Sequence, residues 1–127
     1  MYLGFDDGVG LHTQILASVS WVIYAPEGQL VSLGGVCLQN SSNNVVEYNI
    51  MIELLRDSIS NGIPSLEVHL NSQLVVSQLN GLYQVRDPTL LRRFLRVRLL
   101  QRQFDFITYI HIPRLYNHVF YSYANYN

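Results

Sequence analysis

The amino-terminal third of the chain carries the alternating pattern of apolar and polar residues that is typical of a half-buried β-sheet. Residues 1–5 form a short apolar segment that precedes two acids and a glycine, which predicts a strand that feeds a loop. Residues 17–24 alternate between two faces, with Trp21 on one and Tyr24 on the other. A Pro-Glu-Gly turn at 26–28 then leads into a second run that ends near Leu38. These two runs predict a β-hairpin.

The rest of the chain switches between helical and strand-like spacing. The predicted elements are a helix over 45–60, a strand over 65–70, a short helix over 73–79, a helix from Asp87-Pro88 to about Gln103, a strand over 106–112 and a short carboxyl-terminal helix. Asparagines and serines within 39–44 favour a helix cap, and Ser72 favours another. The apolar side of the helix that begins at Pro88 is expected to consist of Leu91, Phe94, Leu95 and Leu99.

Strands that alternate with helices after an antiparallel start indicate an α/β fold with a mixed sheet. The order contains five strands, so we expect a five-stranded mixed β-sheet flanked by α-helices. No internal repeat or linker interrupts the pattern. A single domain over residues 1–127 is therefore expected.

Composition narrows the class of protein. Hydrophobic residues make up 49% of the chain and charged residues 13%, which argues against disorder. The net charge of −1 gives no global basic field, yet all eight basic residues are arginine and five of them lie within 92–102. The lone Cys37 excludes an intramolecular disulfide. Neither a signal peptide nor a membrane span is recognisable, so an intracellular protein, cytoplasmic or nuclear, is expected.

Four short segments are similar to the motifs of the ribonuclease H superfamily. They occur in the family's order, each on its predicted element, and together they span nearly the whole chain. The segments are Phe5-Asp6-Asp7-Gly8, Asn43-Asn44-Val45-Val46-Glu47-Tyr48, Asn71-Ser72-Gln73-Leu74-Val75-Val76 followed by Gly81-Leu82-Tyr83, and His111-Ile112-Pro113-Arg114 followed by Asn117. The last two resemble the plant and retroelement branch, whose domains are reverse-transcriptase-like. The resemblance implies the ribonuclease H-like fold.

The resemblance also implies a hydrolytic site in which four carboxylates hold two divalent cations. Two such ions, about 3.5–4 Å apart, stabilise the attacking and leaving oxygens of a phosphodiester. The first acid is Asp6, with Asp7 as the alternative, and the second is Glu47. The third and fourth positions hold Asn71 and Tyr121, where the family has aspartates.

These two replacements predict a degenerate site. Asparagine offers a neutral carbonyl in place of a carboxylate, and the tyrosine phenol stays protonated at neutral pH because its pKa is near 10. Asp6 and Glu47 would then hold one Mg²⁺ or Mn²⁺ weakly at most, so no resident cofactor is expected. The ring of Tyr121 is expected to fill the former metal site, with its hydroxyl near Asp6 or Asn71.

Three functions remain open from the sequence. The first is a pseudoenzyme that acts through protein interaction or self-association, because the chain ends early for the family and leaves an apolar face for a protein partner or a homodimer. The second is a non-catalytic binder of RNA–DNA hybrids, and the third is a residual metal-dependent hybrid ribonuclease. The candidate nucleic-acid-binding residues are Asn43, Asn44, Ser72, Gln73, Arg92 and Arg96. A solvated basic helix face is the alternative interpretation of the two arginines.

Overall fold

The computed structural model of the chain describes residues 1–7, 17–38 and 42–113, and this part contains five strands and three helices. In chain order the elements are β1 (Tyr2–Asp7), β2 (Ala17–Tyr24), β3 (Leu30–Leu38), α1 (Asn43–Ser60), β4 (Ser65–Leu70), α2 (Gln73–Leu79), α3 (Pro88–Gln101) and β5 (Phe106–His111). The predicted carboxyl-terminal helix, Tyr121 and the side chain of Cys37 lie outside the described residues.

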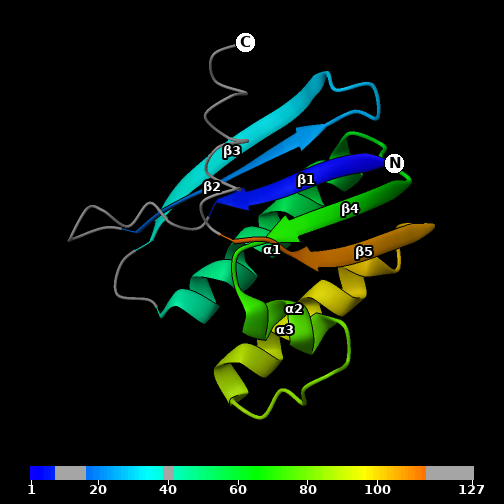
Figure 1. Cartoon of the computed structure of the whole chain (residues 1–127). Helices are drawn as coiled ribbons and strands as arrows, with labels where there is room; N and C mark the ends of the chain where they lie inside the picture. Colours follow the sequence, from blue (N-terminus) through cyan, green and yellow to red (C-terminus); the bar gives the residue numbers. More distant parts are fainter. Residues whose placement is uncertain (8–16, 39–41, 114–127) are drawn as a thin grey trace.

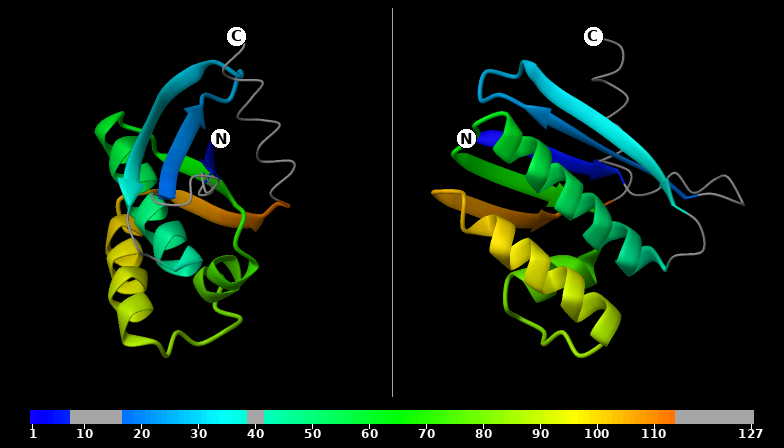
Figure 2. Two further views of the ribbon diagram at one scale, coloured as in Figure 1. Left: turned by 90° about the vertical axis from the view of Figure 1, so that its left-hand side faces the viewer. Right: turned by 180° about the vertical axis from the view of Figure 1, so that it is seen from behind.

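The strands form one mixed sheet in the order β3-β2-β1-β4-β5. β1, β2 and β3 pair antiparallel, whereas β1, β4 and β5 pair parallel. Helix α1 crosses one face of the sheet against β1 and β2, α3 lies beside α1, and α2 lies against β5 (Figures 1 and 2). The observed five-stranded mixed sheet with flanking helices confirms the fold class expected from the sequence.

Strand β1 is longer than the sequence pattern predicted. The expected strand ended at Phe5, but the ladder with β2 continues through Asp6 opposite Trp21 and through Asp7. Pairing with β2 keeps the backbone extended beyond the apolar residues. The two acids therefore belong to the central strand of the sheet and not to a loop.

Helix α1 begins two residues before the predicted start. The side chain of Ser42 accepts a hydrogen bond from the Val45 backbone N–H and is the N-cap of the helix. Both Asn43 and Asn44 are thereby included in the first helical turn. The helix buries an apolar side that includes Met51 and Leu54 against the sheet.

The predicted apolar face of α3 is wrong in three of its four residues. Leu90 and Val97 are the buried residues of this helix and Phe94 is half-buried, whereas the remaining predicted residues are exposed. The exposed leucines are Leu91, Leu95 and Leu99. Long arginine side chains explain the difference, because their stems lie in the interface while their charged ends find polar partners.

Two of these arginines face inward. The Arg93 Nε donates to Asn49 Oδ1 on α1 at 2.9 Å, and Arg98 donates to the Leu79 carbonyl at 2.6 Å. Arg98 also lies over the Phe94 ring, 4.8 Å from its centroid. The helix ends at Gln101, two residues earlier than predicted, and β5 ends one residue earlier, at His111.

A tryptophan fixes the position of β3 relative to α1. The Trp21 Nε1–H donates to Asp57 Oδ2 on α1 at 2.8 Å, and the Ser32 hydroxyl donates to the same oxygen at 2.7 Å. The indole ring lies across Gly34 of β3 so closely that a Cβ built there would be 2.2 Å from Cζ2 of the ring. Glycine is therefore required at position 34.

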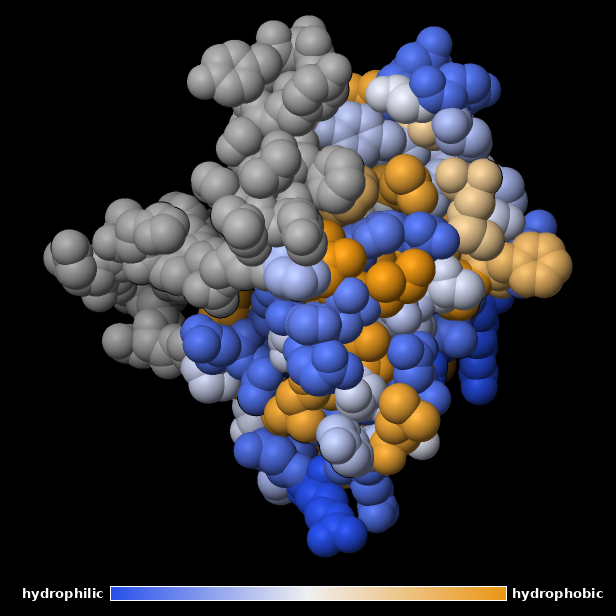
Figure 3. All heavy atoms as spheres, viewed as in Figure 1, coloured by the Kyte–Doolittle hydropathy of each residue, from blue (hydrophilic) through white to orange (hydrophobic). Residues whose placement is uncertain are grey.

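The face of the sheet opposite α1 exposes hydrophobic residues. Figure 3, drawn from that side, shows hydrophobic patches interspersed with hydrophilic residues. Exposed side chains of the outer strands include Leu33 on β3 and both Phe106 and Ile110 on β5. None of the described helices combines the length and the apolarity that crossing a bilayer requires.

Replacing Gly34 with alanine is expected to destabilise the protein by about 1–3 kcal/mol, because the added methyl group displaces the indole ring. Chemical denaturation of the wild type and of Gly34→Ala measures this loss. In a Trp21→Leu background the same change should cost much less, since the ring is no longer present. Equal costs in the two backgrounds would contradict the assigned contact.

Candidate functional site

Asp6 lies in the middle of the sheet with its side chain on the face that α1 covers. Gly4, two residues earlier on the same face, lies beneath Leu54 of α1, because a Cβ built on Gly4 would be 3.0 Å from a Leu54 methyl carbon. Asp6 is fully buried. A carboxylate at this depth is costly unless it is matched by polar or charged groups, so its presence marks a candidate functional site.

Glu47 approaches the same region from α1. It lies seven residues, or two helical turns, before Leu54 and therefore on the same side of the helix. The helix runs antiparallel to β1 (Figure 1), so earlier residues of α1 lie toward the carboxyl end of β1. Glu47 is also buried. The structure thus places both predicted acids at one end of the interface between helix and sheet.

Asn71 follows the last residue of β4 at this same end of the sheet. Phe5 is paired with His69 across β1 and β4, so Asn71 comes just beyond the level of Asp6. The His111 Nε2 lies 3.0 Å from the Asn71 carbonyl oxygen. A carbonyl only accepts, so His111 must carry its proton on Nε2 and donate to this oxygen. This hydrogen bond ties the end of β5 to the turn after β4.

Ser72 connects the starts of two helices. Its hydroxyl oxygen accepts from the Val75 N–H at 3.1 Å and caps α2, as the sequence predicted. The same hydroxyl donates to Asn44 Oδ1 in the first turn of α1, at 3.3 Å. The neighbouring Asn43 and Gln73 are exposed. Four of the predicted nucleic-acid-binding residues therefore lie on two helix starts that a hydrogen bond joins.

A buried tyrosine holds α2 against α1. The Tyr48 hydroxyl donates to Gln78 Oε1 at 2.7 Å, and both residues are buried. Burial raises the pKa of Tyr48 well above its usual value, and the positive charge of Arg98 offsets part of that rise. Sequence reasoning missed this pair. Gln78 is one of two polar residues, with Ser77, among the buried residues of α2, and nothing in the sequence near either residue identifies Tyr48 as its partner.

The remaining predicted residues lie elsewhere or outside the described part. Arg92 and Arg96 are on the exposed side of α3, and the hydrogen bonds among described residues do not link them to Asn44 or Ser72. Their role in phosphate binding stays a prediction. The side chain of Asp7 and all of Tyr121 fall outside the described residues, so the expected position of the Tyr121 ring stays a prediction as well.

The described part of the donor set at this end of the sheet fits a pair of divalent cations poorly. Asp6 and Glu47 bring two carboxylates, and Asn71 brings a neutral amide. Within residues 1–7, 17–38 and 42–113, no three Asp, Glu, His or Cys side chains are grouped so that they could share a metal ion. Two dications need more anionic oxygen than two carboxylates supply.

Comparison with known sequences gives consistent matches. The family model described as reverse transcriptase-like matches residues 6–127. Ribonuclease HI of Halobacterium salinarum is 35% identical over 113 residues, which are 89% of this chain and 57% of that protein. A bifunctional protein of Mycobacterium tuberculosis is 36% identical over 77 residues, 61% of this chain and 21% of its own length. The chain thus spans about half of one relative and a fifth of the other.

Solved structures show the same arrangement of strands and helices. The crystal structure of RNase H1 from Halobacterium salinarum superposes with a TM-score of 0.83 at 32% identity, covering 92% of this chain and 89% of that one. LC11-RNase H1 in complex with an RNA/DNA hybrid gives a TM-score of 0.82 at 28% identity, with coverages of 92% and 88%.

Tyr48→Phe is expected to lower the free energy of unfolding by about 1–3 kcal/mol at neutral pH, because Gln78 loses its buried partner. Folding raises the pKa of Tyr48. Its contribution to the free energy of unfolding is therefore complete below about pH 10 and is lost as pH rises toward the pKa of the folded state. Burial also raises the pKa of Tyr109, so this residue adds to the loss of stability at high pH.

Denaturation curves recorded between pH 8 and 11 measure the effect. The wild type should lose stability above pH 10, and Tyr48→Phe should lose less of it. Tyr83→Phe, at an exposed tyrosine, is the matched control and should follow the wild type. If Tyr48→Phe kept the wild-type slope, the buried hydrogen bond would be contradicted.

Proposed function

The chain belongs to the reverse transcriptase-like family of domains with the ribonuclease H fold, and we propose that it binds RNA–DNA hybrids without hydrolysing them efficiently. The observation that carries this proposal is the residue type at the end of β4. Asn71 lies at the same end of the sheet as two buried acids, Asp6 and Glu47, in a position where the family motif has an aspartate. The domain is then a pseudoenzyme with respect to hydrolysis.

Loss of hydrolysis follows from the charge of the site. An asparagine keeps the shape of an aspartate but removes one negative charge, and the Tyr121 position removes a second. The remaining acids, Asp6 and Glu47, suffice for one weakly held Mg²⁺ or Mn²⁺. With both ions bound, a complete site would stabilise the attacking and leaving oxygens of the phosphodiester. This chain's own acids support at most half of that arrangement.

Retained binding follows from the two helix starts. Asn44 and Ser72 are held together by their hydrogen bond, and Asn43 and Gln73 are exposed beside them. Amides and hydroxyls of this kind bind sugar hydroxyls and base edges. The hybrid bound to LC11-RNase H1, a structural neighbour, supports the same substrate class for this chain.

We also propose an evolutionary origin for the domain and the range of residues that it spans. The Asn71-Ser72-Gln73 and His111-Ile112-Pro113 segments resemble the plant and retroelement branch, which supports a retroelement-type origin. A single domain over 1–127 is part of the same proposal, and the family match over 6–127 supports it.

Binding and cleavage of a fluorescent RNA–DNA hybrid, measured on one preparation, test the proposal. The wild type should bind the hybrid in preference to DNA duplex. With Mg²⁺ or Mn²⁺ it should cleave at least about 100-fold more slowly than the halobacterial ribonuclease, a difference of about 2.7 kcal/mol. Cleavage at the rate of that enzyme would refute the proposed loss of hydrolysis. Absence of hybrid binding would refute the proposed recognition of RNA–DNA hybrids.

Asn44→Ala combined with Ser72→Ala is expected to weaken hybrid binding about tenfold, since two polar contacts are lost. Asn61→Ala, at the opposite end of α1, is the matched control and should bind like the wild type. If the double variant and the control bound the hybrid with equal affinity, the two helix starts would not be part of the binding surface.

A further inference from the structure

Helix α3 exposes a row of leucines on the side that faces away from α1. Leu91, Leu95 and Leu99 are 37%, 51% and 58% exposed, and their four-residue spacing aligns them along one side of the helix. The row is about 12 Å long, which corresponds to two helical turns. A single exposed leucine is common on protein surfaces, but three in line form a continuous apolar strip. We call these three residues the leucine row.

A row of unpaired arginines runs beside the leucine row. Arg92 and Arg96 each follow a leucine of the row directly, and they form this second row. Arg102, the C-cap, comes seven residues after Leu95 and so lies near the end of the leucine row itself. The helix contains no acidic residue. Among the described residues, the ion pairs are those of Arg56 with Glu53 and of His69 with Glu67, so these three exposed arginines have no acidic partner there.

The helix therefore sorts its arginines into two groups. Arg93 and Arg98 face inward and are hydrogen-bonded to Asn49 and to the Leu79 carbonyl. Arg92 and Arg96 face outward, one turn apart, where like charges repel mildly unless an anion lies between them. The first group holds α3 against its neighbours by hydrogen bonds, whereas the second group makes no such contact among the described residues.

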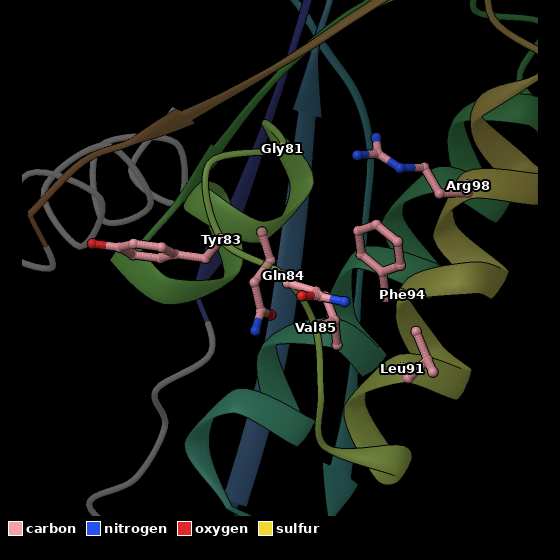
Figure 4. A pocket seen from close by; sticks show the side chains of 8 residues that line it. Gly81, Tyr83, Gln84, Val85, Leu91, Phe94 and Arg98 are labelled. Carbon is pink, nitrogen blue, oxygen red and sulfur yellow. The ribbon is translucent and has the colours of Figure 1, made fainter.

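A hollow of about 440 Å³ adjoins the amino-terminal end of the leucine row. Leu91 lines the hollow and is also the first residue of the leucine row. The apolar side chains of Val85 and Phe94 line the hollow as well. Figure 4 shows Arg98 extending from α3 toward Gly81, while Phe94 lies between Arg98 and Leu91 on the same helix, across from Gln84 and Val85. A hollow of this size holds one large apolar side chain, the usual anchor of a protein interface.

We propose that the outer face of α3 is a docking surface for an acidic amphipathic helix of a partner protein. The partner's apolar side would cover the leucine row and place an anchor residue in the hollow. Its carboxylates would pair with Arg92 and Arg96, which gives the contact its charge complementarity. This proposal does not depend on hybrid recognition by the proposed site at Asn44 and Ser72.

The same features disfavour other occupants. A nucleic acid would use the arginines but would leave the leucine row exposed to water. A second copy packed antiparallel about a twofold axis would bring the two arginine rows to the same side, where they repel. An anionic bilayer usually binds a helix that has free basic residues on both borders of its apolar side. Here Arg92 and Arg96 lie along one border, and Arg98 on the other border is hydrogen-bonded to the Leu79 carbonyl.

Two synthetic helical peptides test the proposal. One has leucines at helical spacing bordered by glutamates, and the other has lysine in place of every glutamate. Fluorescence anisotropy should show that the acidic peptide binds the wild-type protein about tenfold more tightly than the basic one. Arg92→Glu combined with Arg96→Glu should reverse this preference. Leu95→Ser combined with Leu99→Ser should weaken binding of the acidic peptide.

Matched controls make the test specific. Leu33 is exposed to the same extent as Leu95, and Arg86 is an exposed arginine outside α3. Leu33→Ser and Arg86→Glu should bind both peptides like the wild type. No preference between the peptides, or an unchanged preference in the double arginine variant, would overturn the proposal. The proposal would also be wrong if neither peptide bound the wild type and the arginines bound another ligand instead. In that case the double arginine variant would lose affinity for the hybrid or for phosphatidylserine vesicles.

Discussion

Parallel pairing of β1 with β4 is the constraint on which the site depends. Because Phe5 lies opposite His69, the carboxyl end of β1 brings Asp6 to the level at which β4 ends and Asn71 begins the turn to α2. Helix α1, antiparallel to β1 over the same face, adds Glu47. The backbone thus fixes where these side chains lie, and the residue types alone decide how much negative charge gathers there.

That charge decides which chemistry the site supports. Two divalent cations about 4 Å apart repel each other by roughly 17 kcal/mol at an effective dielectric constant of about 20, and a carboxylate at that distance attracts each ion by about half as much. Removing two of four carboxylates halves this attraction, while the repulsion and the cost of dehydrating the ions stay the same. The hydrogen bond between Ser72 and Asn44 involves neither acid. The proposed hybrid recognition by these two residues therefore does not require a complete set of carboxylates.

The sequence predicted the sheet and the capped helix starts because their signals are local. Ser72 caps α2 as expected, and alternation in β4 gave its bounds without error. The inward side of α3 was not predictable, since Arg93 and Arg98 use their stems as apolar surface and their charged ends as donors, which hydropathy does not distinguish from exposure. Likewise, no local signal links Tyr48 to Gln78, 30 residues away.

The chemistry of this site depends on its negative charge, which a calorimetric titration with Mn²⁺ measures through the number and affinity of bound ions. The wild type should bind fewer than two ions per chain, and those weakly. Asn71→Asp combined with Tyr121→Asp should bind ions more tightly, because the two carboxylates are restored. Two tightly bound ions per wild-type chain would contradict the account, as would a double variant that binds no better than the wild type.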